Sequence, residues 1–312
     1  MKLNFHMQNA IAELQCCGPT SFVDLPISVI IPVRNEGQNL PRCLESLAGV
    51  GEIIVIDSHS TDQTCEIARQ HGAQVIQFHY YGGWPKKRQW ALDNLPLQYE
   101  WVLLLDADEA LTPELKQEIR SAIGRTKIDG YWIKLAMHFL GHQLRYCGAT
   151  FSKLSLFRHG KGRFECRISD QDSSMCDMEV HEHVIVNGQT GRLRASIVHH
   201  NVSSLCRYLE KHNEYSNWEA RVWIEPTDHP YALTPKLFGT QAQRRRWLRK
   251  KFFAFPGSPM LLFLYRYFLR LGFLDGRAGL FYCGLQAIQL FHVKAKIYEL
   301  RLRHAQTGVE TC

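Results

Sequence analysis

The sequence predicts an α/β protein with a doubly wound, mostly parallel sheet. Short apolar runs, typical of strands buried on both faces, alternate four times with helix-like segments across short links. Two of these runs, 52–57 and 101–106, end on an aspartate, at the sheet edge where open α/β sheets bind ligands. A chain of 312 residues, 45% of them hydrophobic, is long enough for one large domain with an appendage or for two small domains.

The expected elements follow from apolar periodicity and from residues that start helices. Residues 1–25 show no clear periodicity and are treated as an N-terminal extension. The expected strands cover 27–32, 52–57, 74–78, 101–105 and 130–135. Helices are expected to begin near residues 39, 62, 86 and 113, the last behind the capping residue Thr112. Residues 139–179 are expected to be rich in loops, with short strands such as 154–157.

Three carboxylates follow the most apolar run of the chain. Asp106, Asp108 and Glu109 come directly after Trp101-Val-Leu-Leu-Leu105. Because Mg²⁺ and Mn²⁺ prefer oxygen ligands, this pattern predicts a metal that bridges the phosphates of a nucleotide. The alternative is a solvated acidic turn before the helix at residue 113.

Other nucleotide-binding classes lack their motifs here. The chain has neither the Gly-x-Gly-x-x-Gly of a dinucleotide fold nor the Gly-x₄-Gly-Lys-Ser/Thr of a P-loop. Its ten cysteines are scattered and form no Cys-x-x-Cys pair, and residues 1–24 do not resemble a secretory signal. We therefore expect reduced thiols and a cytoplasmic location.

Three motifs resemble those of family 2 glycosyltransferases, in order and in spacing. They are Ile-Ile-Pro-Val-Arg-Asn-Glu at 30–36, Val-Ile-Asp-Ser-His-Ser-Thr-Asp at 55–62 and Leu-Leu-Asp-Ala-Asp-Glu at 104–109. Residues 82–92 and Val-His-Glu at 180–182 resemble the bacterial lipopolysaccharide-core beta-glucosyltransferase branch. The resemblance implies a GT-A-type fold, with a nucleotide-sugar transferase domain at 26–202, a loop-rich acceptor region and a basic helical appendage at 203–312.

The resemblance also implies the donor site. Nucleotide-sugar contacts fall on Pro32, Asn35, Glu36, Asp57, Arg88 and Asp106. Asp106 and Asp108 would bind Mn²⁺ or Mg²⁺, with His199 as a further ligand, and the metal would neutralise the departing nucleoside diphosphate. Other readings are a turn cap for Asp57, a solvated helix face around Arg88 and a structural role for His199.

Glu182 falls where inverting members of the family keep the carboxylate that deprotonates the acceptor hydroxyl. The alternative is a surface glutamate between two histidines, with Asp177 and Glu179 as further candidates for the base. A zinc site at His181-Glu-His183 is disfavoured, because its spacing differs from His-Glu-x-x-His.

The C-terminal region is strongly basic. Residues 244–303 hold 13 Lys/Arg against two acids, a net charge of +11, while the other residues hold 24 basic and 28 acidic groups. Six bases fall within 244–251, next to aromatic residues, and no run of 18 uncharged apolar residues exists. This pattern predicts that 244–253 contacts an anionic membrane surface. The alternatives are packing on the domain with solvated arginines, or nucleic-acid binding, for which there is no recognition motif.

These observations lead to one hypothesis and two rivals. The hypothesis is a metal-dependent inverting glycosyltransferase, peripheral on the inner face of the cytoplasmic membrane. It would move a hexose from a nucleoside diphosphate sugar, UDP-linked, to a hydroxyl of a lipid-linked or cell-envelope glycan. The rivals are a sugar nucleotidyltransferase, whose Gly-rich first loop is replaced by Val33–Gly37, and an inactive membrane-peripheral scaffold with the same fold.

Overall fold

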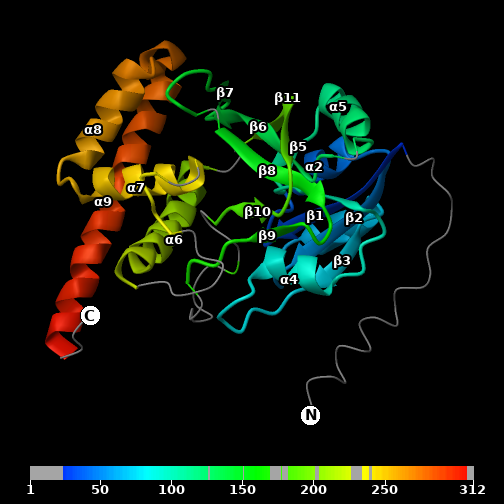
Figure 1. Ribbon diagram of the computed structural model, residues 1–312, viewed down its shortest axis with the longest axis horizontal. Helices are drawn as coiled ribbons and strands as arrows, with labels where there is room; N and C mark the ends of the chain where they lie inside the picture. The colour runs from blue at the N-terminus through cyan, green and yellow to red at the C-terminus, as the bar shows by residue number, and fades with distance from the viewer. Residues whose placement is uncertain are drawn as a thin grey trace.

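The computed structural model describes residues 24–125, 127–149, 151–168, 177, 182–200, 204–225, 234–238 and 241–307, with backbone alone at 241, 242 and 245. A nine-stranded sheet and a two-stranded sheet form one side of this part of the chain, and four helices after residue 204 form the other (Figure 1). The strands are β1 (Leu25–Val33), β2 (Val50–Asp57), β3 (Gln74–Gln77), β4 (Trp101–Leu104), β5 (Glu109–Ala110), β6 (Gly130–Phe139), β7 (His142–Gln143), β8 (Phe151–Arg158), β9 (Gly162–Phe164), β10 (Val184–Val186) and β11 (Thr190–His200). The helices are α2 (Leu40–Ser46), α3 (Thr64–Gln70), α4 (Lys87–Asn94), α5 (Pro113–Ile123), α6 (Leu205–Ile224), α7 (Gln241–Ala254), α8 (Ser258–Leu264) and α9 (Gly276–Thr307).

The first half of the large sheet is parallel and buried on both faces. Its order is β3-β2-β1-β4, and β1 pairs in parallel with both β2 and β4. Val29 and Ile31 of β1 pack in the core that includes Leu44 and Leu115, from α2 and α5. Ile30 packs in the other core, with Ala91 of α4. The near-continuous apolar run of β1 follows from this double cover, which confirms the doubly wound α/β prediction.

The second half of the sheet is mixed. β8 lies between β4 and β6 and runs antiparallel to both, so the predicted fifth strand, β6, does not neighbour β4. The short strand predicted at 154–157, within a region expected to be rich in loops, is the buried part of β8. A run of four residues indicates a strand but not its place in the middle of the sheet.

β11 brings a distant segment to the end of β4. It pairs in parallel with β6 and antiparallel with the two-residue strand β5, where His199 lies opposite Glu109. The main chain of His200 also donates a hydrogen bond to the carbonyl of Asp108, at 2.9 Å. The pairing therefore sets His199 beside the carboxylates that follow β4.

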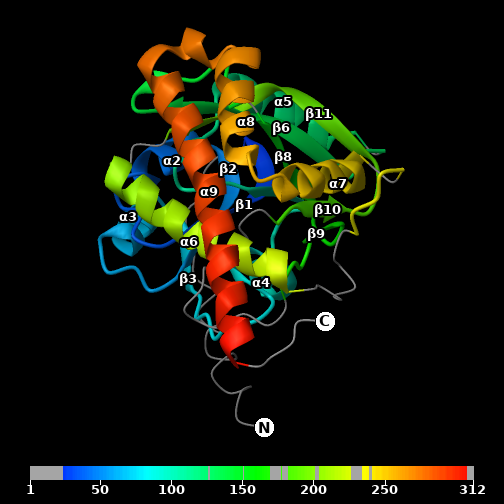
Figure 2. The ribbon, with the colours of Figure 1, turned by 90° about the vertical axis from the view of Figure 1, so that its left-hand side faces the viewer.

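The C-terminal helices form a separate layer. Figure 2 shows α6, α7, α8 and α9 on one face of the molecule, with α9 running along its length. α8 continues into a π-helical turn, Tyr265–Leu269, and a 3-10 turn, Gly272–Asp275, precedes α9. No helix among the described residues has the length and apolarity to cross a membrane.

Candidate active site

A pocket opens at the carboxyl end of β4. It holds about 530 Å³, counting the part open to solvent. Its lining residues come from β4 and the turn after it, from α4, β6, β8 and β9, and from β10 with the two residues before it: Arg88, Leu104, Asp106, Trp132, Lys153, Leu154, Ser155, Phe164, Glu182, His183 and Val184. The pocket thus brings together three residues predicted from sequence, Arg88, Asp106 and Glu182.

Asp106 lies in a cluster of two acids and two bases. Arg88 Nη2 pairs with Asp106 Oδ1, and Lys153 Nζ lies 3.2 Å from Asp106 Oδ2. The same Lys153 Nζ donates to both carboxylate oxygens of the buried Glu109, at 2.7 Å. Burial alone would raise the pKa of Asp106, but Arg88 and Lys153 outweigh it and hold that pKa far below its ordinary value. For Glu109, burial dominates and raises the pKa.

Asp108 pairs with His199 instead. Asp108 Oδ2 and His199 Nε2 are 3.3 Å apart. Burial would lower the pKa of His199, but the Asp108 carboxylate raises it to about 9. The same imidazole, working against burial, lowers the pKa of Asp108. The structure therefore brings the two predicted metal ligands together, and their binding of a metal stays a prediction.

The donor chemistry of this pair fits a divalent ion. Two ligands on adjacent positions of an octahedral ion with bonds of about 2.1 Å lie about 3 Å apart, close to the observed separation. Among the described residues, no group of three or more His, Cys, Asp or Glu side chains is arranged to hold a metal. An ion at this pair would therefore complete its shell with phosphate oxygens and water, as Mg²⁺ usually does.

Glu182 forms a buried ion pair across the pocket wall. Lys86 Nζ donates to Glu182 Oε2 at 3.0 Å, and neither side chain is exposed. The main chain of Arg167 donates to Glu182 Oε1 at 3.2 Å. Lys86 also lies 4.8 Å from the ring centroid of Trp218, in α6. These contacts fix the carboxylate in place, so the sequence alternative of a surface glutamate does not describe it.

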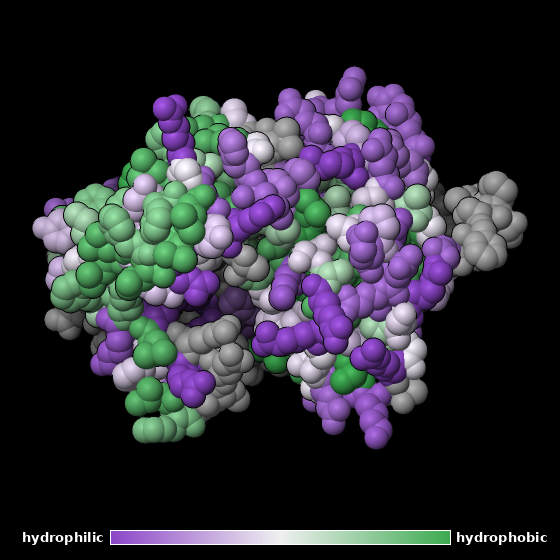
Figure 3. All heavy atoms as spheres, turned by 90° about the horizontal axis from the view of Figure 1, so that it is seen from above, coloured by the Kyte–Doolittle hydropathy of each residue, from purple (hydrophilic) through white to green (hydrophobic). Residues whose placement is uncertain are grey.

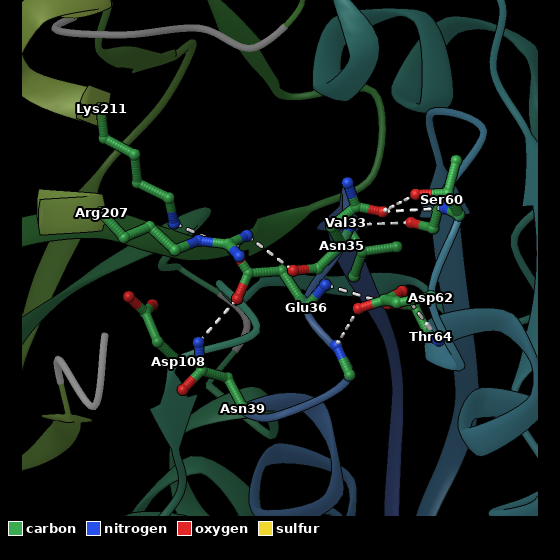
Figure 4. A network of polar contacts seen from close by, with 12 residues as sticks. Val33, Asn35, Glu36, Asn39, Ser60, Asp62, Thr64, Asp108, Arg207 and Lys211 are labelled. Atoms are coloured by element: carbon green, nitrogen blue, oxygen red, sulfur yellow. Dashed lines mark hydrogen bonds and ion pairs between the residues drawn. The ribbon is translucent and has the colours of Figure 1, made fainter. Parts of the chain in front are cut away.

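The loop after β1 is held by a network of polar contacts (Figure 4). Asn35 adopts a positive φ of 54°, and its side-chain oxygen accepts from the main chain of Thr61 at 2.8 Å. Glu36 accepts from Asn39 at 2.7 Å and from Lys211 of α6 at 2.9 Å. The left-handed backbone of Asn35 is one that Asn tolerates well, which explains its place in the motif.

Asp57 and Pro32 are buried inside the sheet. The Asp57 carboxylate accepts from Ser60 N and Gln77 Nε2 at 3.0 Å, and from Cys65 Sγ at 3.1 Å. Burial raises the pKa of Asp57, but the hydrogen bonds that its carboxylate accepts, above all those from Ser60, outweigh burial and lower the pKa. Pro32 is buried in β1 opposite Ile56. Contact of either residue with a nucleoside stays a prediction, and Asp57 would have to exchange partners to make it.

Comparison with known proteins identifies the family. A family model described as glycosyl transferase family 2 matches residues 28–167. An uncharacterized glycosyltransferase of Rickettsia felis (strain ATCC VR-1525 / URRWXCal2) is 31% identical over 200 residues, which are 62% of this chain and 69% of that protein. The chain belongs to glycosyl transferase family 2.

Other relatives of this glycosyltransferase agree with the resemblance. Lipopolysaccharide core biosynthesis glycosyltransferase LpsC of Rhizobium meliloti (strain 1021) is 27% identical over 301 residues, 92% of this chain and 97% of the relative. Among solved structures, Staphylococcus aureus TarS 1-349 covers 89% of this chain and 92% of its own, at 16% identity and a TM-score of 0.45. Mycobacterium tuberculosis glucosyl-3-phosphoglycerate synthase with Mn²⁺, UDP and phosphoglyceric acid covers 36% and 44%, at 23% identity and a TM-score of 0.30. With TM-scores below 0.5, neither structure supports a conclusion about this chain.

Sequence reasoning missed several site residues of this family 2 enzyme. Lys153 comes from β8, whose place in the sheet has no local signal. Lys86 is buried, although a Lys-Lys-Arg run usually indicates a solvated helix face, and so is Lys87, which was a weaker candidate than Arg88 for the diphosphate contact. Arg207 and Lys211 reach from α6 to the loop after β1, where Arg207 Nη2 donates to the Asn35 carbonyl at 2.6 Å. Their spacing of four residues, one helical turn, was the only available signal.

Two further predictions have partial outcomes. Glu179 and His181 lie outside the described residues, whereas Asp177 Oδ2 accepts from Ser58 and lies 3.1 Å from Lys87 Nζ. In the basic segment 244–253, two of the arginines make ion pairs within the protein.

Proposed function

We propose that this family 2 enzyme is a metal-dependent inverting glycosyltransferase. It transfers a hexose from a UDP-linked donor to a hydroxyl of a lipid-linked or cell-envelope glycan, at the inner face of the cytoplasmic membrane. The observation that carries the proposal is the pocket that joins Asp106, two cations and Glu182, with the Asp108–His199 pair next to it. In this proposal, residues 26–202 form the transferase domain and 203–312 the membrane-facing region.

The cations of the pocket suit a diphosphate. Arg88 and Lys153 are both paired with Asp106, and each has donors that match phosphate oxygens. A diphosphate in the pocket would share these donors, so that positive charge lies where the leaving group gains negative charge. Asp108 and His199 would hold Mn²⁺ or Mg²⁺, which supplies further electrostatic stabilisation of the leaving diphosphate. Metal contact by Asp106, which is paired with Arg88 and Lys153, stays a prediction.

Glu182 is the proposed general base. In the reaction, the acceptor oxygen forms a bond to the anomeric carbon while the bond from that carbon to the diphosphate oxygen breaks. The electron pair of the broken bond leaves with the diphosphate, and the Glu182 carboxylate takes the proton of the acceptor hydroxyl. Lys86 acts as a positioning residue, because its ion pair holds the carboxylate at the pocket wall.

The loop after β1 is the proposed nucleoside site. Asn35 and Glu36 are held by contacts from α3, its preceding turn and α6, which leaves the loop preorganised. Burial raises the pKa of Asp108, whereas His199 and, to a smaller extent, the Lys211 ammonium lower it. α6 therefore links the nucleoside loop to the carboxylates that follow β4.

The test is transfer from a panel of UDP-, GDP-, CMP- and dTDP-sugars into a bacterial glycolipid extract. We expect label from a UDP-hexose to enter the lipid phase with Mn²⁺, but not with EDTA and not with Asp108→Ala. Glu66→Ala, which changes an exposed carboxylate on α3 that does not line the pocket, serves as the matched control. Turnover of no donor would favour the inactive scaffold. Formation of a sugar nucleotide and pyrophosphate from a nucleoside triphosphate and a sugar phosphate would favour the nucleotidyltransferase.

A further inference from the structure

The C-terminal helices expose a large share of the protein's apolar side chains. Seventeen of the 27 exposed large hydrophobic residues in the described part of the chain lie between Phe252 and Leu302. Figure 3 shows them as a broad hydrophobic area on the left of the view from above, over α8 and α9. Contiguous apolar area on a protein surface usually marks contact with another molecule.

α9 carries apolar residues on two opposite faces. One face is buried against neighbouring helices and loops and contains Ala278, Tyr282, Cys283, Val293 and Ile297. The other face contains Phe281, Ile288, Phe291, Tyr298 and Leu302, spaced by three, four or seven residues, and all five are exposed. A helix that is apolar on both sides is normally covered on both sides, but in the described part of the chain no element covers the second face of α9.

α8 and the turns that follow it continue this surface. Met260, Leu264 and Phe268 recur at one-turn spacing and are exposed, and Leu269 is 76% exposed. The 3-10 turn adds Phe273 and Leu274. We call the whole set the apolar face: Met260, Leu261, Leu264, Tyr265, Phe268, Leu269, Phe273, Leu274, Leu280, Phe281, Ile288, Phe291, Tyr298 and Leu302.

The charges around the apolar face are almost all positive. Residues 244–303 carry a net charge of +11. Their two acids are already occupied: Asp275 accepts from Arg145 N and Tyr146 N at 3.0 Å, and Glu299 accepts from Arg303 at 2.6 Å. Two copies of the chain joined through this face would bring two basic surfaces together, whereas anionic lipid headgroups would neutralise one.

We propose that the apolar face lies in the interface of an anionic bilayer, with its side chains among the acyl chains. This inference rests on the proposed function, because it names the membrane that presents the lipid-linked acceptor. It also revises the predicted contact at 244–253. Arg246 points inward to the buried Glu165 at 2.7 Å, and Arg249 pairs with Glu219, so only part of that segment remains for lipid.

The apolar face is attached directly to the acceptor side of the sheet. The main chain of Cys147 donates to the Arg270 carbonyl at 2.9 Å, and Arg266 Nη1 donates to the Cys147 carbonyl at 3.1 Å. Cys147 lies in the loop beyond β6, whose carboxyl end lies at the same edge of the sheet as that of β4. Binding through the apolar face would therefore hold this edge of the sheet near the lipid surface.

Vesicle flotation of the full chain tests the proposal. The vesicles contain phosphatidylcholine and phosphatidylglycerol in equal parts, in NaCl at about 0.1 M and about 1 M, where the Debye length falls from about 10 Å to about 3 Å. We expect the protein to float at both concentrations, because insertion of apolar side chains is not screened by salt. Phe281→Gln/Phe291→Gln is expected to lower vesicle binding by about tenfold or more, since affinity follows buried apolar area.

The matched control is Leu237→Gln/Phe238→Gln, which changes two exposed apolar residues outside the apolar face. It should bind vesicles as the wild type does. Normal vesicle binding by Phe281→Gln/Phe291→Gln would overturn the proposal, as would complete release of the wild type at high salt. If the wild type does not bind vesicles but forms dimers, and Phe281→Gln/Phe291→Gln disrupts those dimers, the apolar face binds a second copy of the chain instead. Stabilisation by UDP and Mn²⁺ without vesicles, measured on the same samples, tests the proposed function separately.

Discussion

The carboxyl edge of the sheet and the C-terminal helices depart from the usual placement of residues in opposite directions. At the sheet edge, Lys86, Lys87, Glu109 and Glu182 are buried, although such charged residues are rarely buried unless they are paired. In the helices, large apolar side chains are exposed. The first departure is compensated within the protein by ion pairs, and the second is not. We therefore expect the stability and activity of the sheet edge to depend on its ion-pair partners and on pH. The exposed face of the C-terminal helices should instead respond to lipid.

The largest expected effect is on the proposed base. Glu182→Gln keeps the shape of the side chain but removes the proton acceptor, and should lower the transfer rate by roughly 10²–10⁴-fold. Because the substitution also removes the counter-charge of Lys86 and lowers stability, UDP binding with Mn²⁺ should be unchanged at a temperature where the variant is still folded. Single-turnover transfer and calorimetry measure the two quantities. If transfer survives in Glu182→Gln but fails in Asp177→Asn, the base is Asp177 instead.

Lys86→Met should strongly destabilise the fold. It removes the ammonium that pairs with Glu182 at 3.0 Å and leaves that charge buried, which typically costs about 3–5 kcal/mol. Urea unfolding measures the loss in the free energy of unfolding. Lys86→Met/Glu182→Leu should recover most of it, because it removes both charges of the pair. A single variant as stable as the wild type would mean that Glu182 reaches solvent or another partner.

Arg246→Gln tests whether the basic residues of α7 that make ion pairs within the protein stabilise the fold, unlike those that are exposed. It removes the pairing partner of the buried Glu165, and we expect a loss of roughly 2–3 kcal/mol in the free energy of unfolding. Lys250→Gln, on the exposed side of the same helix, should change it by no more than about 0.5 kcal/mol. Equal losses of stability for the two substitutions in urea titrations would contradict this distinction between paired and exposed basic residues.

Mn²⁺ affinity should depend on pH through His199. The Asp108 carboxylate, against the effect of burial, raises the pKa of His199 to about 9, and a metal must displace the bound proton. Affinity should therefore rise by about tenfold per pH unit below about pH 9 and level off above it. His199→Gln has no proton to release and should show a flat profile in isothermal titrations. The same slope in both proteins would remove His199 from the site.

Local motifs predicted the part of the site that is local in sequence. Asp106 and Asp108 follow a buried strand, and strand ends meet at one edge of a parallel sheet, so their position could be inferred from the run before them. Arg88 and Glu182 were placed by resemblance, and both line the pocket. Lys153 could not be found in this way, because it reaches Asp106 only through the antiparallel insertion of β8.

The C-terminal region shows a different limit. A cluster of arginines is typical of a solvated or lipid-binding surface. The sequence does not reveal that Arg246 pairs with a buried glutamate 81 positions earlier. The apolar residues of α9 were equally ambiguous, since a helix with two apolar faces is normally buried. Only the packing of α6 and α8 against one face shows that the other face is open.

Binding of UDP in the presence of Mn²⁺ tests the central claim most directly. Thermal unfolding is followed for the wild type and for Asp108→Ala, with UDP and either Mn²⁺ or EDTA. Ligand at 100 times its dissociation constant adds about 2.7 kcal/mol to native-state stability, which should raise the Tm by several degrees. The account predicts this rise for the wild type with Mn²⁺ and its absence with EDTA and in Asp108→Ala. No rise for UDP or any other nucleoside diphosphate, with or without metal, would contradict it.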